Sequence, residues 1–251
     1  MTKSYAAQHY GARAQDYVAS TVHSQGGDLD AVEQAAQGKQ WRRVLDLGCG
    51  GGHVAYRLAA HVAEVTACDV TDQMLRAVDA EAIRRSLANI RTIQAPAERL
   101  PFEDGVFDAV FCRFTTHHWN DAAAGLREAR RVLARNGAAM FIDVTAPAVA
   151  VADSWLQTLE LLRDVSHVRD YSVVEWRKLL DDAGFALKDV STDRLRMEFG
   201  SWVARTQTPP ERIAAIRSLQ EAAPEEVVRL LGIESDGSFT LDVSVFSVEA
   251  V

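Results

Sequence analysis

Cysteine is scarce in this chain, and its positions form no metal-binding or redox pattern. Cys49, Cys68 and Cys112 are widely separated, and no Cys-x-x-Cys pair is present. Disulfide frameworks usually have even numbers of cysteines and zinc sites have closely spaced ones, so we expect neither. Isolated thiols are typical of a protein of the reducing cytoplasm, where each is predicted to be a small buried hydrophobic residue.

The chain also lacks long apolar runs and an excess of positive charge. No segment approaches the roughly 18 apolar residues of a membrane-spanning helix, and the opening Met-Thr-Lys-Ser-Tyr has no apolar signal core. The formal net charge is −8, whereas nucleic-acid binding requires a concentrated basic surface. We therefore expect a cytoplasmic protein without a membrane span or a nucleic-acid partner.

The chain contains alternating strand-like and helix-like segments, in a number that suits one large domain. Its 251 residues are 48% hydrophobic, which suits a single core. The alternation predicts a parallel sheet with helices on both faces. Strands are expected near 43–47, 64–69, 90–94, 107–112 and 138–144, with helices near 53–60, 72–87 and 122–134.

The last hundred residues are predicted to add a helical cap and two further strands. A helix after Pro147 leaves the sheet, and another runs from Val173 to Ala183. Strands near 185–192 and 239–247 complete the sheet, and helical material lies between them at about 195–234.

The most informative segment is an apolar run that ends in an acid and is followed by glycines. A buried strand ends at Asp46, and Gly48, Gly50 and Gly52 allow the backbone to turn tightly and approach a ligand. The next helix directs its free N–H groups into that turn. The dinucleotide pattern G-x-G-x-x-G would place its third glycine where His53 stands. The segment therefore predicts a nucleotide-like ligand and disfavours NAD.

The strand near 64–69 also ends in an acid, Asp69. A carboxylate at this strand tip can accept both hydroxyls of a ribose, which is the role we predict. The alternative is that Asp69 caps the helix beginning near Asp72, although Thr71 is equally suited to that position.

Four motifs in this order resemble the class I S-adenosylmethionine (SAM) dependent methyltransferases. After the glycine turn and Asp69 come Ala-Glu-Arg-Leu-Pro-Phe at 97–102, followed by Phe-Asp-Ala-Val-Phe at 107–111, and the Leu-Arg-Glu helix and turn at 126–137. The resemblance is closest to the ubiquinone and menaquinone biosynthesis (methyltransferase type 11) branch. Within it, His118-Trp119 and the segments 164–171 and 201–209 resemble the bacterial YafE type.

The resemblance implies a Rossmann-like, doubly wound α/β fold. Its seven-stranded sheet would be mostly parallel, with one antiparallel C-terminal strand. Residues 1–251 would form one domain, divided into an N-terminal helical lid at 1–40, a SAM-binding core at 41–147, and cap helices with C-terminal strands at 148–251. The N-terminal segment is either such a lid, hinged at Gly26-Gly27, or a helix packed on the domain.

The resemblance also implies SAM as cofactor, with S-adenosylhomocysteine (SAH) as product. Two positions depart from the family: Pro96 replaces an acid that binds the adenine amino group, and Asn136 replaces a proline. Adenine would then be recognised by the backbone near Ala97. The implied cofactor contacts are Asp46, Gly48, Cys49, Gly50, Gly52, Asp69, Val70, Met74, Ala97, Glu98, Arg113 and, in the lid, Tyr17 and His23.

Two histidines, His117 and His118, are the candidate catalytic residues. They follow the fourth predicted strand, at the sheet edge where open α/β folds bind ligands. Methyl transfer from a sulfonium is an in-line displacement that depends mainly on positioning, and a base adds to the rate. Adjacent residues usually point apart, so we expect at most one to face the methyl group. A structural hydrogen bond is the alternative for His118. With no third ligand nearby in the sequence, we expect no metal.

Four residues are candidates for contacts with the methyl acceptor. Two roles are open for each. Trp119 stacks on a flat acceptor or packs under its loop, and Asp143 polarises the acceptor or caps a turn. Arg169 contacts a carboxylate of the acceptor or forms an ion pair with Asp164 or Asp170. Trp202 would line a cavity or pack the cap.

We predict methyl transfer from SAM to an O, N or C atom of a small organic molecule, by a monomer or homodimer. The alternatives are a nicotinamide-dependent oxidoreductase and a SAM-binding regulatory protein without turnover.

Overall fold

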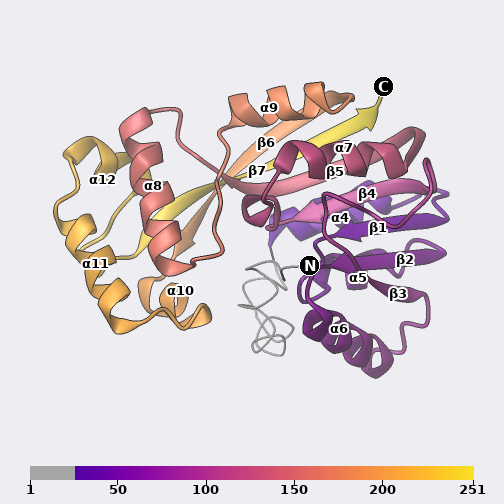
Figure 1. Cartoon of the computed structure of the whole chain (residues 1–251), viewed down its shortest axis with the longest axis horizontal. Helices are drawn as coiled ribbons and strands as arrows, with labels where there is room; N and C mark the ends of the chain where they lie inside the picture. Colours follow the sequence, from indigo (N-terminus) through magenta and orange to yellow (C-terminus); the bar gives the residue numbers. More distant parts are fainter. Residues whose placement is uncertain (1–25) are drawn as a thin grey trace.

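An open seven-stranded sheet is the centre of the computed structural model, which describes residues 26–251 (Figure 1). The order across the sheet is β3-β2-β1-β4-β5-β7-β6. The first five strands run parallel, and β7 is antiparallel to both of its neighbours, which confirms the predicted fold class. The strands are β1 (Arg43–Leu47), β2 (Glu64–Asp69), β3 (Ile90–Gln94), β4 (Phe107–Arg113), β5 (Leu133–Thr145), β6 (Phe185–Met197) and β7 (Phe239–Ala250).

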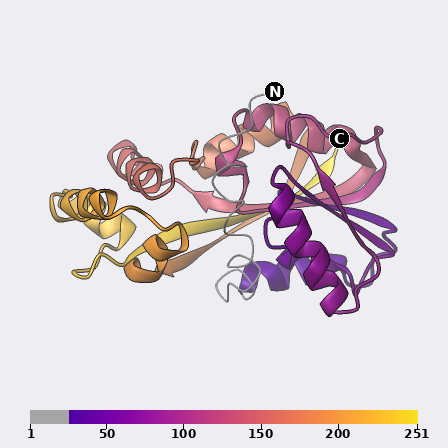
Figure 2. The same ribbon diagram turned by 60° about the horizontal axis from the view of Figure 1, so that its bottom comes forward.

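Helices cover both faces of this sheet (Figure 2). One face carries α4 (Gly27–Ala36), α5 (His53–Leu58) and α6 (Asp72–Arg84), and the other carries α7 (Ala122–Val132) and α9 (Val173–Asp182). Because both faces are covered, β1 and β4 are buried along almost their whole length. The helices bury one stripe each: in α7 it comprises Leu126, Ala129 and Val132.

A helical cap stands beside the sheet, at the carboxyl ends of β5 and β6 (Figure 1, left). It contains α8 (Ala150–Arg163), α10 (Phe199–Arg205), α11 (Pro210–Glu221) and α12 (Glu225–Leu231). The cap has its own apolar cluster, in which Trp202 packs edge-on against Phe239 with ring centroids 4.8 Å apart. Since Phe239 begins β7, the long antiparallel strands join the cap to the core.

The elements differ from the expected ones in two places. β5 begins at Leu133, directly after α7, so the turn expected near Asn136 lies within the strand. Asn136 has φ +61°, and the β4–β5 register shifts between Phe107 and Ala109. The segment at 195–234 is helical as predicted except at its start, because β6 continues to Met197.

The predicted division of the chain into lid, core and cap stays a prediction. Residues 1–25 of the proposed lid, including Tyr17 and His23, lie outside the described residues. The remainder of the lid is α4, which buries Leu29, Val32 and Ala36 against the core. Between residues 26 and 251, none of the helices combines the length and hydrophobicity needed to cross a bilayer.

Candidate active site

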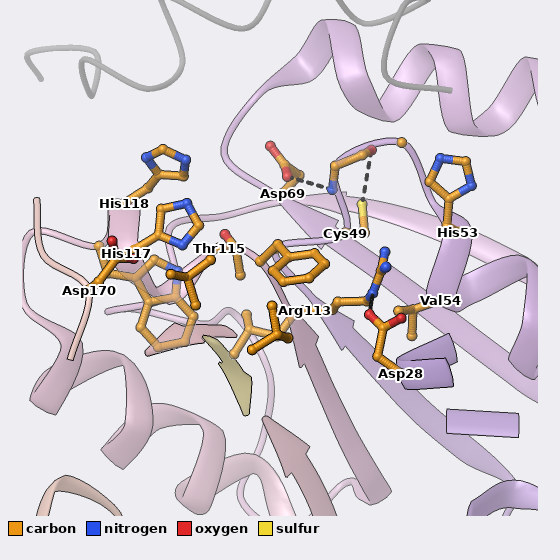
Figure 3. A pocket seen from close by; sticks show the side chains of 18 of the residues that line it. Asp28, Cys49, His53, Val54, Asp69, Arg113, Thr115, His117, His118 and Asp170 are labelled. Carbon is orange, nitrogen blue, oxygen red and sulfur yellow. Dashed lines mark hydrogen bonds and ion pairs between the residues drawn. The ribbon is translucent and has the colours of Figure 1, made fainter. Parts of the chain in front are cut away.

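A cavity of about 550 Å³ lies between the carboxyl ends of the central strands and the cap. Its core wall is formed by residues at and after the ends of β1, β2, β3 and β4, and its cap wall by residues of α8, β6, β7 and α10. Figure 3 shows Asp69 and Cys49 beside the glycine turn, with His117, His118 and Asp170 grouped apart from them. The volume is within the range of small-molecule sites.

The glycine turn depends on two backbone conformations that other residues adopt poorly. Gly48 has φ +71°, and a Cβ added there would lie 2.4 Å from the Thr115 side chain. Gly52, the N-cap of α5, has φ +79°, and a Cβ there would lie 2.8 Å from the Tyr56 ring. A side chain at either position would be strained by the positive φ and would also clash with a neighbouring side chain. Glycine is therefore required at both positions.

Asp46 joins this turn to the helix that follows it. Its side chain is buried, and Oδ2 accepts the N–H of Ala55, in the first turn of α5, at 3.0 Å. Burial raises the pKa of Asp46 to about 7, against the effect of this hydrogen bond. Asp46 therefore holds the loop closed while also lining the cavity.

Asp69 connects the tip of β2 to the same turn. Its Oδ2 accepts the Gly50 N–H at 3.0 Å, and its Oδ1 accepts the Thr71 N–H at 2.8 Å. The N-cap of α6 is Thr71, so helix capping does not account for Asp69. Each carboxylate oxygen has two lone pairs, and both therefore retain the capacity to accept a hydroxyl proton from a ligand. Burial raises the pKa of Asp69.

Most of the sequence-predicted cofactor residues meet in this cavity. Glu98 also organises its wall, because Oε1 accepts the Asn120 N–H at 3.0 Å. Gly52 does not line the cavity and acts on the shape of the turn instead. All three cysteines are buried, as predicted. The predicted cofactor residues that line the cavity are Asp46, Gly48, Cys49, Gly50, Asp69, Val70, Met74, Ala97, Glu98 and Arg113.

Arg113 has a partner that the sequence did not reveal. Its guanidinium forms an ion pair with Asp28 of α4, and both side chains are mostly buried. Asp28 and the preceding Gly26 and Gly27 also line the cavity. The pair therefore attaches the described end of the N-terminal segment to the end of β4.

The two histidines lie in a 3₁₀ turn, η2 (Thr116–His118), and titrate in opposite directions. Burial alone would lower the pKa of His117, but the charge and hydrogen bond of Asp143, whose Oδ1 lies 2.6 Å from Nδ1, raise it to about 9. Burial and the neighbouring His117 lower the pKa of His118 to about 3. At pH 7 His117 is therefore protonated and His118 neutral.

Hydrogen bonding also determines which nitrogen of His118 is basic. Nδ1 lies 3.1 Å from the Ser166 carbonyl oxygen, so Nδ1 carries the proton and Nε2 the lone pair. Both histidines line the cavity, with ring centroids 4.1 Å apart. The tight turn therefore does not separate them as expected.

The candidate acceptor residues are placed differently from one another. Trp119 and Trp202 line the cavity and are also buried in the core and the cap, respectively. Asp143 does not line it and acts through His117.

Arg169 is also outside the lining residues, so the structure does not support its predicted contact with the acceptor. It forms ion pairs with Asp153 at 3.1 Å and Glu175 at 2.9 Å, rather than with Asp164 or Asp170. The irregular segment before α9 directs Asp170 into the cavity wall instead.

A polar group on the cap side of the cavity was not predicted from the sequence. Two of its residues, Glu160 and Arg163, form an ion pair on α8 at 3.2 Å. Their i, i+3 spacing was visible in the sequence, but it is equally common on exposed helix faces. The missed residues that line the cavity include Glu160, Arg163, Asp170, Asp193, Arg194 and Arg205.

Comparisons with known proteins identify the family and the fold. A family model described as a methyltransferase domain matches residues 45–141. The Escherichia coli K12 protein YafE is 43% identical over 196 residues, which cover 78% of this chain and 95% of YafE. The Bacillus subtilis 168 methyltransferase YcgJ is 35% identical over 199 residues, 79% of each chain. The crystal structure of YcgJ has a TM-score of 0.86 at 31% identity, covering 89% of this chain and 98% of that one.

Proposed function

Because the chain belongs to the class I SAM-dependent methyltransferases, whose methyl donor is SAM, we propose that it methylates an O, N or C atom of a small organic acceptor. The observation that carries this proposal is one cavity in which the glycine turn and Asp69 face a pair of histidines. A cytoplasmic location and a monomeric or homodimeric state remain predictions from the sequence.

The residues present fit the methyl donor on two grounds. Gly48 and Gly50 line the cavity without side chains, and the space beside Gly50 is open, so a ligand can approach the backbone of the turn closely. Asp69 is held by two backbone N–H groups and retains lone pairs for the ribose hydroxyls. In this proposal Ala97 contributes backbone groups near the adenine, because Pro96 has no carboxylate to offer.

The bound donor supplies a methyl group on a sulfonium, which is activated for in-line displacement. The protein's main task is then to orient the acceptor and exclude water, and correct alignment alone is worth roughly 7 kcal/mol or more in favourable cases. The cap supplies the wall that closes the cavity, with Leu195, Trp202 and Leu241 as its apolar part. We assign the selection of the methyl acceptor to this wall of the cavity.

The opposite pKa shifts of the histidines distinguish two catalytic schemes. If His118 accepts the acceptor's proton at Nε2, the rate does not change between pH 6 and 9, because the pKa of His118 is about 3. If His117 is the base, the rate rises toward pH 9, because only the deprotonated fraction is active. Replacing each by Asn separately removes the base while keeping a polar group.

The deciding experiment incubates the full chain with SAM labelled on its methyl group and with pools of small acceptors. Formation of SAH with a labelled product is expected, and H118N or H117N should lower turnover 10²–10⁴-fold if that residue is the base. If both variants stay within a few-fold of wild type, positioning alone carries the reaction. Binding of NAD without binding of SAM or SAH would overturn the proposal, and SAM binding without turnover on any pool would favour a regulatory role.

A further inference from the structure

A compact group of metal-ligating side chains lies in the cavity wall, beside the histidine turn. His117 comes from η2, Asp143 from the end of β5 and Asp170 from the segment before α9. One ligand atom from each lies within 4.8 Å of the other two. The side chains of His117 and Asp143 are 16% and 2% exposed, and Asp170 is 2% exposed. Three different elements therefore converge on one small, largely dry volume.

Asp170 provides the second, independent observation. Its Oδ2 is buried and has no hydrogen-bond partner among residues 26–251. Its backbone, in contrast, is fixed, because the Asp170 N–H donates to Gln157 Oε1 at 3.0 Å and the Asp170 carbonyl accepts from Gln157 Nε2 at 2.8 Å. A carboxylate oxygen that is held in place and left without a donor loses its hydration without compensation.

The group holds two carboxylates, Asp143 and Asp170, against one imidazole. His117 is already hydrogen-bonded to Asp143, and Glu160, which also lines the cavity, is itself paired with Arg163. A divalent cation that displaces the proton of His117 into solvent, and is coordinated by the neutral imidazole and the two carboxylates, would make this group electrically neutral.

We propose that His117, Asp143 and Asp170 bind one divalent metal ion at the wall of the cavity. One imidazole nitrogen and two carboxylate oxygens suit Mn²⁺, Fe²⁺ or Zn²⁺ better than Mg²⁺, which prefers oxygen ligands alone. Ligands about 2.1 Å from one ion lie roughly 3.0–3.4 Å apart, so the side chains need to close by about 1–2 Å. Three protein ligands leave coordination positions open toward the cavity, as in catalytic sites.

No metal was expected from the sequence, because no third ligand accompanies the histidine pair locally. The fold supplies the missing ligands from β5 and from the segment after α8. Binding of the ion does not depend on the proposed function. Only the role of the ion depends on it: an open coordination position facing the cavity would take an oxygen or nitrogen of the acceptor.

The test is a titration of the chelator-treated full chain with Mn²⁺, followed by electron paramagnetic resonance. We expect the signal of free Mn²⁺ to decrease with one ion bound per chain, Zn²⁺ to displace it, and Asp170→Asn to weaken binding at least tenfold. The matched control is Asp153→Asn, which removes an acid of an adjacent ion pair and should leave Mn²⁺ binding unchanged. A metal-dependent rise in the wild type's unfolding temperature, absent in the Asp170→Asn variant, is the second readout.

The proposal is overturned if wild type binds neither Mn²⁺ nor Zn²⁺ at millimolar concentration, or if Asp170→Asn binds Mn²⁺ within twofold of wild type. If Asp170→Asn is more stable than metal-free wild type and wild type binds no metal, the unpaired Asp170 oxygen only lowers the stability of the folded protein and does not mark a metal site. SAH calorimetry and the turnover assay on the same samples separate the two proposals. Failure of the metal site leaves SAH binding intact, whereas loss of SAH binding, or SAM binding without turnover, counts against the proposed function and not against the metal site.

Discussion

Replacing Asp69 by Asn tests the cofactor assignment most directly, because the change removes charge while preserving shape. The two carboxylate oxygens accept the N–H groups of Gly50 and Thr71, and in the proposed complex they also accept the ribose hydroxyls. The amide has one acceptor oxygen, and its NH₂ group is a donor that would face an N–H or a hydroxyl. One charge-assisted contact to the ligand is therefore lost.

Such a contact is worth about 1.5–3 kcal/mol, which corresponds to roughly a 10- to 150-fold increase in the Kd for SAH. Isothermal titration calorimetry measures this Kd, and thermal unfolding verifies that the variant is folded. A loss of about 1 kcal/mol in stability is expected as well, since one loop N–H loses its acceptor.

Asp72→Asn is the matched control, because Asp72 is a half-exposed acid in the first turn of α6 that pairs with Arg76 at 2.6 Å. Its removal should leave the Kd for SAH unchanged and cost less than about 1 kcal/mol of stability. A folded Asp69→Asn variant whose Kd stays within threefold of wild type would refute the ribose assignment.

Three further predictions concern the turn, the cap and the histidine pair. Gly48→Ala should lower the free energy of unfolding by about 1–3 kcal/mol and weaken SAH binding, because φ is +71° and the new Cβ would meet Thr115 at 2.4 Å. Unchanged SAH binding would contradict the close approach of the backbone to the ligand. Trp202→Ala should cost about 3–5 kcal/mol in urea unfolding, because the ring is fully buried in the cap, and a loss below 1 kcal/mol would contradict that packing. Despite burial, Asp143 raises the pKa of His117 from 6.5 to about 9. In the presence of chelator, the stability advantage of wild type over H117N should therefore be constant below pH 6.5. It should shrink by up to about 3 kcal/mol as the pH rises through 9. A difference that does not vary with pH would exclude this stabilisation of the imidazolium.

The parts of the cavity whose positions could be predicted from the sequence are local in it. The strand, the glycine turn and the following helix occupy fewer than twenty consecutive residues, and positive φ at Gly48 and Gly52 is a property that the residue type itself permits. Likewise, a strand that ends in an acid specifies where Asp69 lies, because the carboxyl ends of parallel strands meet at one edge.

The placement of side chains could not be predicted where the chain has no regular period. The segment between α8 and α9 is irregular, so spacing does not indicate which of its neighbouring polar residues faces the cavity. Arg169 was chosen, yet it pairs with Asp153 and Glu175, and Asp170 lines the cavity instead. The start of β5 was misplaced for a related reason: Asn136 is a turn residue by type, but pairing with β4 keeps it within a strand.

The sequence by itself determined the order of elements, the mostly parallel sheet and the cofactor turn, since periodicity and glycine conformation act over short stretches of chain. Only the tertiary structure decided the chemistry of the cavity's other half. The pairing of His117 with Asp143, the opposite pKa shifts of the two histidines and the buried oxygen of Asp170 all require groups distant in the chain to be brought within a few ångströms and removed from water. Burial and electrostatic coupling depend on that final arrangement, and no local pattern encodes them.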